Sequence, residues 1–173
     1  MRTISSRQNP LVQAFRGLAE SPDPGHVRIL LDGTHLVRDA VRAGLDIETA
    51  AVGAAHVDQP GEERELALVL EAAGADVVTV TDPVLAAMSP VRSPSGVVAI
   101  ARRSVATVAQ LCARPDQVLL VAVDVQDPGN VGSLIRAAEA AGAGGVLVCG
   151  LSANPFSWKA PVSYTHLTLP TKA

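Results

Sequence analysis

The fold of this chain is indicated most clearly by residues 118–150, which read VLLVAVDVQDPGNVGSLIRAAEAAGAGGVLVCG. The opening run, Val118–Val123, is entirely apolar, as is typical of a strand covered on both faces of a parallel sheet. We therefore expect this strand to occupy a central position rather than an edge. Turn-forming residues follow at Asp127–Asn130, and Asn130 is a suitable N-cap for a helix over Val131–Ala141. This order of strand, turn and helix predicts an α/β unit.

The predicted helix has two different faces. Its apolar stripe comprises Val131, Leu134, Ile135 and Ala138. Gly132, Arg136 and Glu139 fall on another face, because a helix repeats every 3.6 residues. After the helix, small residues at 142–145 lead to the apolar Val146–Cys149, which predicts the next parallel strand.

The turn before this helix is a candidate site, because α/β proteins tend to bind ligands where a buried strand passes into a glycine-containing loop and a helix start. Gly132 leaves room for a ligand backbone or phosphate, and the helix start favours an anion. A purely structural interpretation is also open: Asn130 only caps the helix, Gly132 only makes a close contact, and Arg136 only pairs with Glu139. The spacings G-x-G-x-x-G and G-x-x-x-x-G-K-[ST] are absent from the loop. The spacing therefore permits a site without defining its chemistry.

The preceding part of the chain alternates between helical and strand patterns. Apolar residues at helical spacing over Leu11–Leu18 predict a helix, which ends at the Pro/Gly-rich residues 21–25. The predicted strands are Val27–Leu31, Ile47–Val52, Val77–Val80 and Gly96–Ala101, with helices at about 36–41, 61–73 and 82–88. Strands that alternate with helices predict a compact α/β domain.

The chain divides into four expected parts. These are a first domain over residues 1–103, a linker over 104–117 with a short helix at Val108–Cys112, a second unit over 118–160, and a tail over 161–173. The fold class we expect is therefore α/β, with a small α/β domain followed by the beginning of a second α/β domain.

Composition excludes several classes of protein. At 173 residues and 48% hydrophobic residues, the chain can bury a substantial core. Its two cysteines, Cys112 and Cys149, form no disulfide framework or metal-ligand spacing, which suits a reducing, cytoplasmic setting. No apolar run resembles a signal peptide or approaches the roughly 20 residues that span a bilayer. We expect a soluble protein without a metal site and without membrane contact.

Charge gives only modest support for nucleic-acid binding. The formal net charge of −3 argues against binding through bulk positive charge, and aromatic residues, at 2%, offer few stacking platforms for bases. Arg2, Arg7 and Arg16, however, all precede the first acidic residue, Glu20. Any RNA contact would depend on arginines and backbone groups, whereas the alternative is that this asymmetry is only solvated surface.

A resemblance to a known family indicates a function, which the spacing of the residues does not. Residues 127–138, DPGNVGSLIRAA, resemble the first signature motif of the SpoU (TrmH-like) branch of the SPOUT RNA 2′-O-ribose methyltransferases. Residues 4–12, 30–40 and 93–99 resemble the substrate-binding domain that precedes the catalytic domain in this family. The resemblance covers about residues 4–160, with a mild departure at Asp32, where relatives more often carry Glu.

The resemblance implies methyl transfer from S-adenosylmethionine to a ribose 2′-hydroxyl of structured RNA, either rRNA or tRNA. It implies catalytic roles for Asn130 and Arg136, and an RNA-facing role for Gly132, which gives clearance. Arg136 would lie nearest the reacting hydroxyl; because arginine stays protonated to above about pH 12, it suits electrostatic stabilisation better than general base catalysis. Arg7 and Asn9 are the RNA contacts we expect in the first domain, although both also suit a solvated position before the first helix.

After Ala160 the chain departs from the family. Relatives continue through a glycine/glutamate motif and a serine/asparagine motif, which build an α/β knot and the cofactor pocket. Residues 161–173, PVSYTHLTLPTKA, have no helical period and resemble the translated read-through of a sequencing adapter. We therefore expect an inactive fragment with a non-native tail, in which Tyr164 and His166 have no function. The cofactor-binding residues remain unassigned, and the full-length protein is expected to be a homodimer.

Two other functions remain open. The first is a non-catalytic RNA-binding protein that uses only the first domain and binds RNA in a salt-sensitive manner. The second is an unrelated nucleotide-binding α/β enzyme with its site at Gly129–Gly132, which the missing fingerprints make the weakest of the three.

Overall fold

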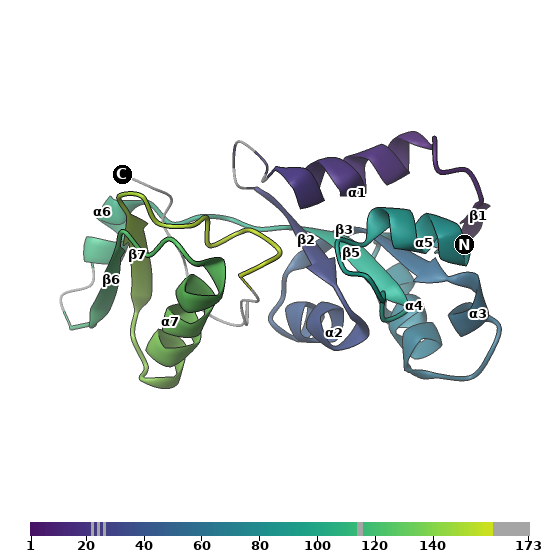
Figure 1. Ribbon diagram of the computed structural model, residues 1–173. Helices are drawn as coiled ribbons and strands as arrows, with labels where there is room; N and C mark the ends of the chain where they lie inside the picture. Colours follow the sequence, from purple (N-terminus) through teal and green to yellow (C-terminus); the bar gives the residue numbers. More distant parts are fainter. Residues whose placement is uncertain (22, 24, 26, 114–115, 161–173) are drawn as a thin grey trace.

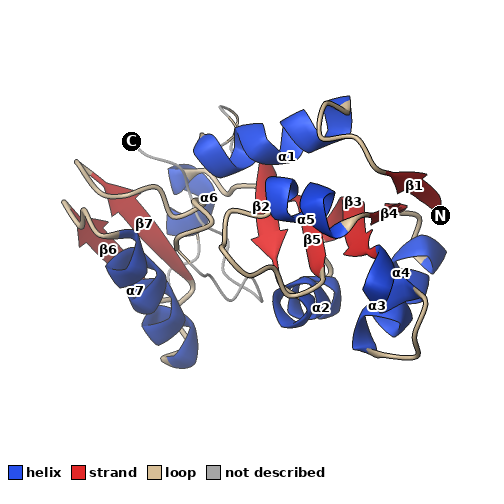
Figure 2. Ribbon diagram, turned by 45° about the vertical axis from the view of Figure 1, so that its right-hand side comes forward, coloured by secondary structure: helices blue, strands red, loops and turns tan. Residues whose placement is uncertain are grey.

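The structure, a computed structural model, describes residues 1–21, 23, 25, 27–113 and 116–160. Its strands form two separate sheets, one of five strands and one of two, each accompanied by helices (Figures 1 and 2). This confirms the α/β class. The predictions for Tyr164, His166 and the rest of the tail lie outside the described residues. Within the described part, no helix is long and apolar enough to cross a membrane.

The first sheet has the strand order β1-β4-β3-β5-β2. Its strands are β1 (Arg2–Ile4), β2 (Arg28–Asp32), β3 (Asp46–Gly53), β4 (Asp76–Val80) and β5 (Val97–Arg102). Strand β4 is parallel to β1 and β3, whereas β5 runs antiparallel to β2 and β3. The four predicted strands are confirmed. β1 was not predicted, because a strand of three residues with only Ile4 buried has no readable alternation.

Helices cover both faces of this sheet (Figure 2). They are α1 (Pro10–Glu20), α2 (Thr34–Arg42), α3 (Ala54–Val57), α4 (Glu62–Ala72) and α5 (Asp82–Met88). Phe15 of α1 and Met88 of α5 pack with Leu30 on one face, whereas α2 and α4 pack with Ile29 and Leu31 on the other. Because consecutive strand residues point to opposite faces, β2 contributes to both halves of the core.

The second sheet consists of the parallel strands β6 (Leu119–Val123) and β7 (Gly145–Cys149). The prediction of a parallel strand after the helix is confirmed. The prediction that the first strand is central and covered on both faces is wrong: among the described residues β6 pairs only with β7, and Val121 and Val123 are 54% and 58% exposed. An apolar run favours burial, but other residues must supply the layer that covers it. Among the described residues, only α7 (Pro128–Ala140) and its neighbours cover this sheet, on one face.

Helix α7 begins earlier than predicted. Asp127 is its N-cap and accepts a hydrogen bond from the Asn130 N–H at 2.8 Å, while Pro128 occupies the first turn. The prediction that Asn130 caps a helix from Val131 is therefore wrong. Asp is a strong N-cap, and proline suits the first helical position because no hydrogen bond is lost there. Asn130 lies inside the first turn instead.

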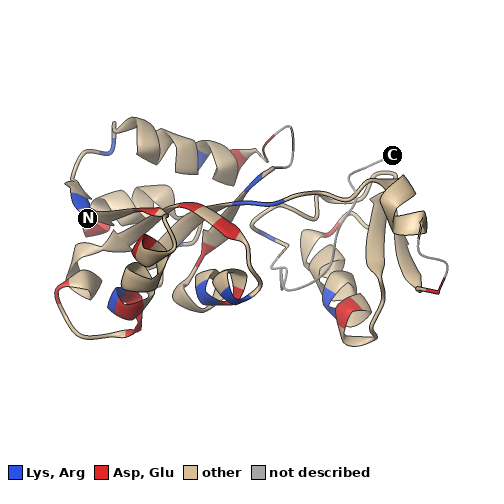
Figure 3. Cartoon of the chain, turned by 180° about the vertical axis from the view of Figure 1, so that it is seen from behind, with Lys and Arg blue, Asp and Glu red and all other residues tan. Residues whose placement is uncertain are grey.

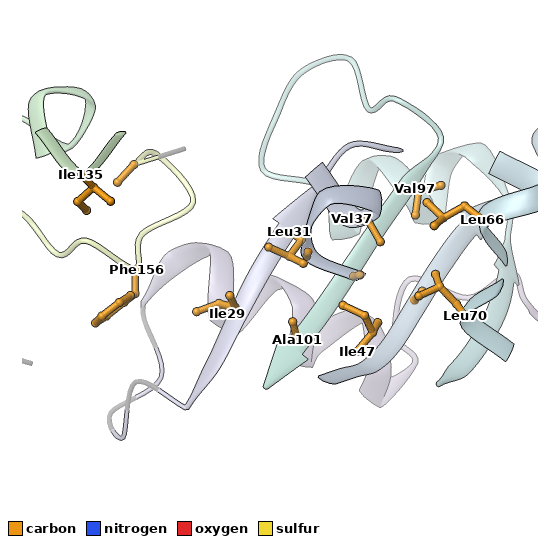
Figure 4. Close-up of a cluster of buried hydrophobic side chains, with 14 of the residues drawn as sticks. Ile29, Leu31, Val37, Ile47, Leu66, Leu70, Val97, Ala101, Ile135 and Phe156 are labelled. Atoms are coloured by element: carbon orange, nitrogen blue, oxygen red, sulfur yellow. The ribbon is translucent and has the colours of Figure 1, made fainter. Parts of the chain in front are cut away.

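The first sheet and the β6–β7 unit share a continuous apolar cluster. In Figure 4 this cluster runs from Leu66 and Leu70 of α4, through Ile29 of β2, to Phe156 and Ile135 of α7. The chain between the two units contains α6 (Val108–Cys112), whose Leu111 is buried. The boundaries predicted at residues 103 and 117 remain a prediction.

The end of β7 requires a glycine. Gly150 has a φ of +67°, which L side chains rarely adopt, and a Cβ there would collide with the carboxylate of Asp124. That carboxylate accepts a hydrogen bond from the Leu151 N–H at 2.7 Å. Gly142, which follows α7, has a similar φ of +72°, but a Cβ added to it would meet no atom within 4 Å. The two glycines therefore differ chiefly in the space around them.

We predict that Gly150→Ala lowers the free energy of unfolding by about 2 kcal/mol or more, because it combines backbone strain with displacement of Asp124. Gly142→Ala, the matched control, should cost about 1 kcal/mol, from backbone strain alone. Urea denaturation measures both values. Equal losses of unfolding free energy in the two variants would show that the displacement of Asp124 does not destabilise the protein.

We also predict that Asp127→Ala lowers the free energy of unfolding by about 1 kcal/mol, because the first turn of α7 loses its cap. Asp127→Asn should retain most of that stability, since Asn caps equally well, and Asn130→Ala should change it by less than about 0.5 kcal/mol. Thermal denaturation of the three variants tests this, and a larger loss for Asn130→Ala than for Asp127→Ala would contradict it.

Candidate functional site

The candidate site lies at the carboxyl ends of β6 and β7. Because the two strands are parallel, the loops that follow them, residues 124–127 and 150–154, meet at the same edge of the sheet. Open α/β sheets bind ligands in the crevice outside this edge. The N-terminus of α7 begins at the same edge, so its partial positive charge also acts there.

Hydrogen bonds join the two loops. The buried Ser152 hydroxyl accepts the Val125 N–H at 3.0 Å and donates to the Cys149 carbonyl at 2.7 Å. The Ala153 N–H donates to the Val125 carbonyl at 2.8 Å. Ser152 was not predicted from the sequence, although a serine two residues after the glycine that ends an apolar strand is a signal of turn chemistry.

On the outer face of α7, Arg136 is held by a serine. Its Nη2 donates to the Ser133 hydroxyl at 3.0 Å, and that hydroxyl donates to the Gly129 carbonyl at 2.9 Å. This chain of contacts runs from the middle of the helix toward its N-terminus and draws the exposed guanidinium toward the site edge. Ser133 was not predicted either, although its spacing of three residues from Arg136 places the two side chains on neighbouring turns.

The other two predicted residues of α7 differ in exposure. Asn130 is exposed on the first turn, as a ligand contact requires. Gly132, expected on the same face as Arg136, is buried. The backbone of Gly132 is thus covered, and its role in giving clearance to RNA remains a prediction.

Arg7 and Asn9 lie apart from these residues. The start of α1 is at the end of the molecule far from α7 (Figures 1 and 2). The Asn9 side chain caps α1 by accepting the Leu11 N–H at 2.9 Å, and the exposed Arg7 donates from Nε to the Pro83 carbonyl at 3.1 Å. Both residues therefore have structural contacts, and one RNA would have to extend along the molecule to reach both predicted regions.

Basic residues also follow the path from the first sheet to the second unit (Figure 3). A β-bulge in β3 places Glu48 between Arg28 and Arg102, whose Nε atoms lie 2.9 and 2.8 Å from its carboxylate. Burial by itself would raise the pKa of Glu48, but the hydrogen bonds from Arg102 and Arg28 hold that pKa below its usual range. These two arginines are thus partly neutralised within the protein.

The residues at the site edge do not by themselves fit S-adenosylmethionine. The N–H groups of Val125, Leu151 and Ala153 are engaged in hydrogen bonds between or within the two loops. These three donors are therefore not available to hydrogen-bond an adenosine group. Among the described residues, no group of three or more His, Cys, Asp or Glu side chains is arranged to hold a metal ion.

Comparison with known proteins finds a substrate binding domain and an RNA methyltransferase that are similar to this chain. Residues 25–99 match the MRM3-like substrate binding domain. The chain is 32% identical over 161 residues to an uncharacterized tRNA/rRNA methyltransferase of Synechocystis sp., and the alignment covers 91% of this chain and 56% of that protein. The chain thus spans little more than half the length of this curated relative.

Solved structures give the same result. An rRNA methyltransferase from Sinorhizobium meliloti superposes with a TM-score of 0.78 at 28% identity, covering 99% of this chain and 65% of that one. Its AdoMet-bound structure gives 0.80 at 25% identity, with 99% and 64% covered. The SpoU methyltransferase AviRb from Streptomyces viridochromogenes, at 22% identity and 96% and 63% coverage, shares the fold with a TM-score of 0.80. The chain is thus similar in sequence and in fold, over nearly all of its length, to rRNA and tRNA methyltransferases, and its residues 25–99 match a substrate binding domain.

Proposed function

We propose that this chain provides the RNA-holding unit and the first motif of an RNA 2′-O-ribose methyltransferase that acts on structured rRNA or tRNA with S-adenosylmethionine. The observation that carries the proposal is the contact chain Arg136–Ser133–Gly129, which directs a guanidinium toward the N-terminus of α7, at the carboxyl edge of a parallel sheet. Its relatives are rRNA and tRNA methyltransferases, and the Sinorhizobium meliloti neighbour has been solved with AdoMet bound.

The proposed role of Arg136 is electrostatic. When a ribose 2′-hydroxyl loses its proton, negative charge develops on its oxygen, and a fixed cation lowers the energy of that state. The guanidinium stays protonated at neutral pH, and Ser133 limits its rotamers, so little reorganisation is needed during reaction. Asn130, on the exposed first turn, is positioned to hydrogen-bond a ribose or phosphate oxygen.

The proposed role of the first unit is to hold the RNA through arginines and backbone groups. The match of residues 25–99 to a substrate binding domain supports this. Homodimerisation of the full-length protein and a cytoplasmic location remain predictions, as does the expectation that this chain alone is inactive.

We predict that Arg136→Ala, in a protein extended to the full length of its relatives, abolishes methyl transfer to rRNA or tRNA and leaves the fold intact. Arg136→Lys should recover only a small part of the rate, because an ammonium lacks the planar set of donors. Transfer of a labelled methyl group measures the rate, and circular dichroism verifies folding. Arg42→Ala, at an exposed arginine of α2 paired with Asp39, is the control. Unchanged turnover in Arg136→Ala would contradict the proposed role.

We predict that Arg7→Ala weakens binding of the 173-residue chain to tRNA and lowers the magnitude of its salt slope by about one, as expected for one lost phosphate contact. Asn9 needs a different test, because Asn9→Ala would also remove the cap of α1. Asn9→Ser retains a capping oxygen and removes only the amide. Filter binding over a range of salt concentrations, with Arg42→Ala as control, measures the slopes. An unchanged slope for Arg7→Ala would remove Arg7 from the RNA contacts.

One observation favours a non-catalytic RNA-binding protein as the second candidate. The family match at residues 25–99 lies entirely in the first unit, which contains none of the α7 residues. Binding of tRNA combined with no methyl transfer by the full-length gene product would favour this candidate.

A further inference from the structure

The segment after β7, residues 150–160, which we call the junction strap, contacts both units. Its first part is bonded to the loop after β6 through Ser152 and Ala153. Its second part crosses to the first unit, where the Trp158 indole packs against the apolar cluster of α1 and α5. The Trp158 Nε1–H donates to the Ala19 carbonyl of α1 at 3.1 Å.

A second anchor lies between these two ends. Phe156 is 4% exposed and belongs to the apolar cluster that contains Ile29 and Ile135 (Figure 4). The Arg103 guanidinium carbon lies 3.0 Å from the centroid of the Phe156 ring, a cation–π contact at the point where the chain leaves the first sheet. Apolar packing, a cation–π contact and a hydrogen bond thus secure the strap at separate points.

The strap is also stiffened by turns of its own. The Asn154 side chain accepts the Phe156 N–H at 2.8 Å, and the Ala160 N–H donates to the Ser157 carbonyl at 2.9 Å. A segment with such local bonds has few alternative conformations, so its anchors hold a nearly constant separation.

We propose that Trp158 is a positioning residue, which fixes the first unit relative to the N-terminal end of α7 so that one RNA molecule contacts both. This inference rests on the proposed function, because it takes RNA as the shared ligand. The predicted contact Arg7 lies in the loop before α1 and Arg136 lies on α7, and the start of α1 and α7 are at opposite ends of the molecule (Figure 1). Two contact regions at a fixed separation bind one long ligand with a high effective concentration, and loosening their connection lowers that concentration.

The first test uses the intrinsic fluorescence of the 173-residue chain. Trp158 is its single tryptophan, so emission reports this residue alone. A docked indole should emit at a shorter wavelength than N-acetyltryptophanamide, and iodide should quench it at least threefold less efficiently. Quenching equal to that of N-acetyltryptophanamide would overturn the inference.

The second test compares a long ligand with a short one. Trp158→Ala should weaken binding of tRNA about tenfold, whereas binding of a ribotrinucleotide, which reaches only one unit, should change less than twofold. Trp158→Phe keeps a ring in the cluster of α1 and α5 but lacks the N–H donor, and should recover most of the tRNA affinity. Thermal melting followed by circular dichroism verifies that each variant is folded.

The outcomes separate the two proposals. Equal weakening for tRNA and trinucleotide, or no weakening for either, would overturn the positioning role and leave RNA binding intact. If the unaltered chain bound no tRNA, the proposed function and the positioning role would both fail, while a protected indole would still show that the strap is docked.

Discussion

The hydrogen bonds of Ser152 are the constraint on which the second unit depends. One hydroxyl joins the end of β7 to the end of β6 and the loop after it, and its three contacts, with the Val125 N–H and the carbonyls of Cys149 and Ala122, are all with backbone groups. It therefore sets the separation of the two loops and, with it, the place from which the strap departs toward the first unit. Because the hydroxyl is buried, leaving it without these partners would cost about 1–3 kcal/mol.

The two proposed tasks, RNA holding and catalysis, belong to different units of the molecule. The first unit has a sheet covered by helices on both faces. The buried core on the side of α1 and α5 comes from this unit alone, whereas the core on the side of α2 and α4 continues into the second unit. The second unit carries the proposed catalytic residues on α7, and in the described residues one face of its sheet stays open at Val121 and Val123. A site distributed over two units works only if their relative placement is constant. The contacts of Phe156 and Trp158 meet this need, because each joins the strap to residues of the first unit.

Individual residues show how far the sequence pattern could be interpreted. Strands with clear apolar runs, such as β3 and β7, were predicted because a continuous apolar run bounded by turn residues is a strong local signal. The start of α7 was misplaced because Asp127 and Asn130 are equally good caps, and only the hydrogen bond between them identifies which one acts. Arg136 was selected by resemblance, whereas its partner Ser133 became evident only from contact geometry.

The sequence by itself determined the α/β class, the order of the main strands and helices, and the motif that resembles the SpoU methyltransferases, because these depend on local propensity, periodicity and residue identity. Only the tertiary structure decided the antiparallel place of β5, the exposure of β6 and the burial of Gly132. It also decided that Trp158 meets the carbonyl of Ala19, 139 residues earlier in the chain. Such features depend on which distant segments pack together, and no local pattern of residues encodes that pairing.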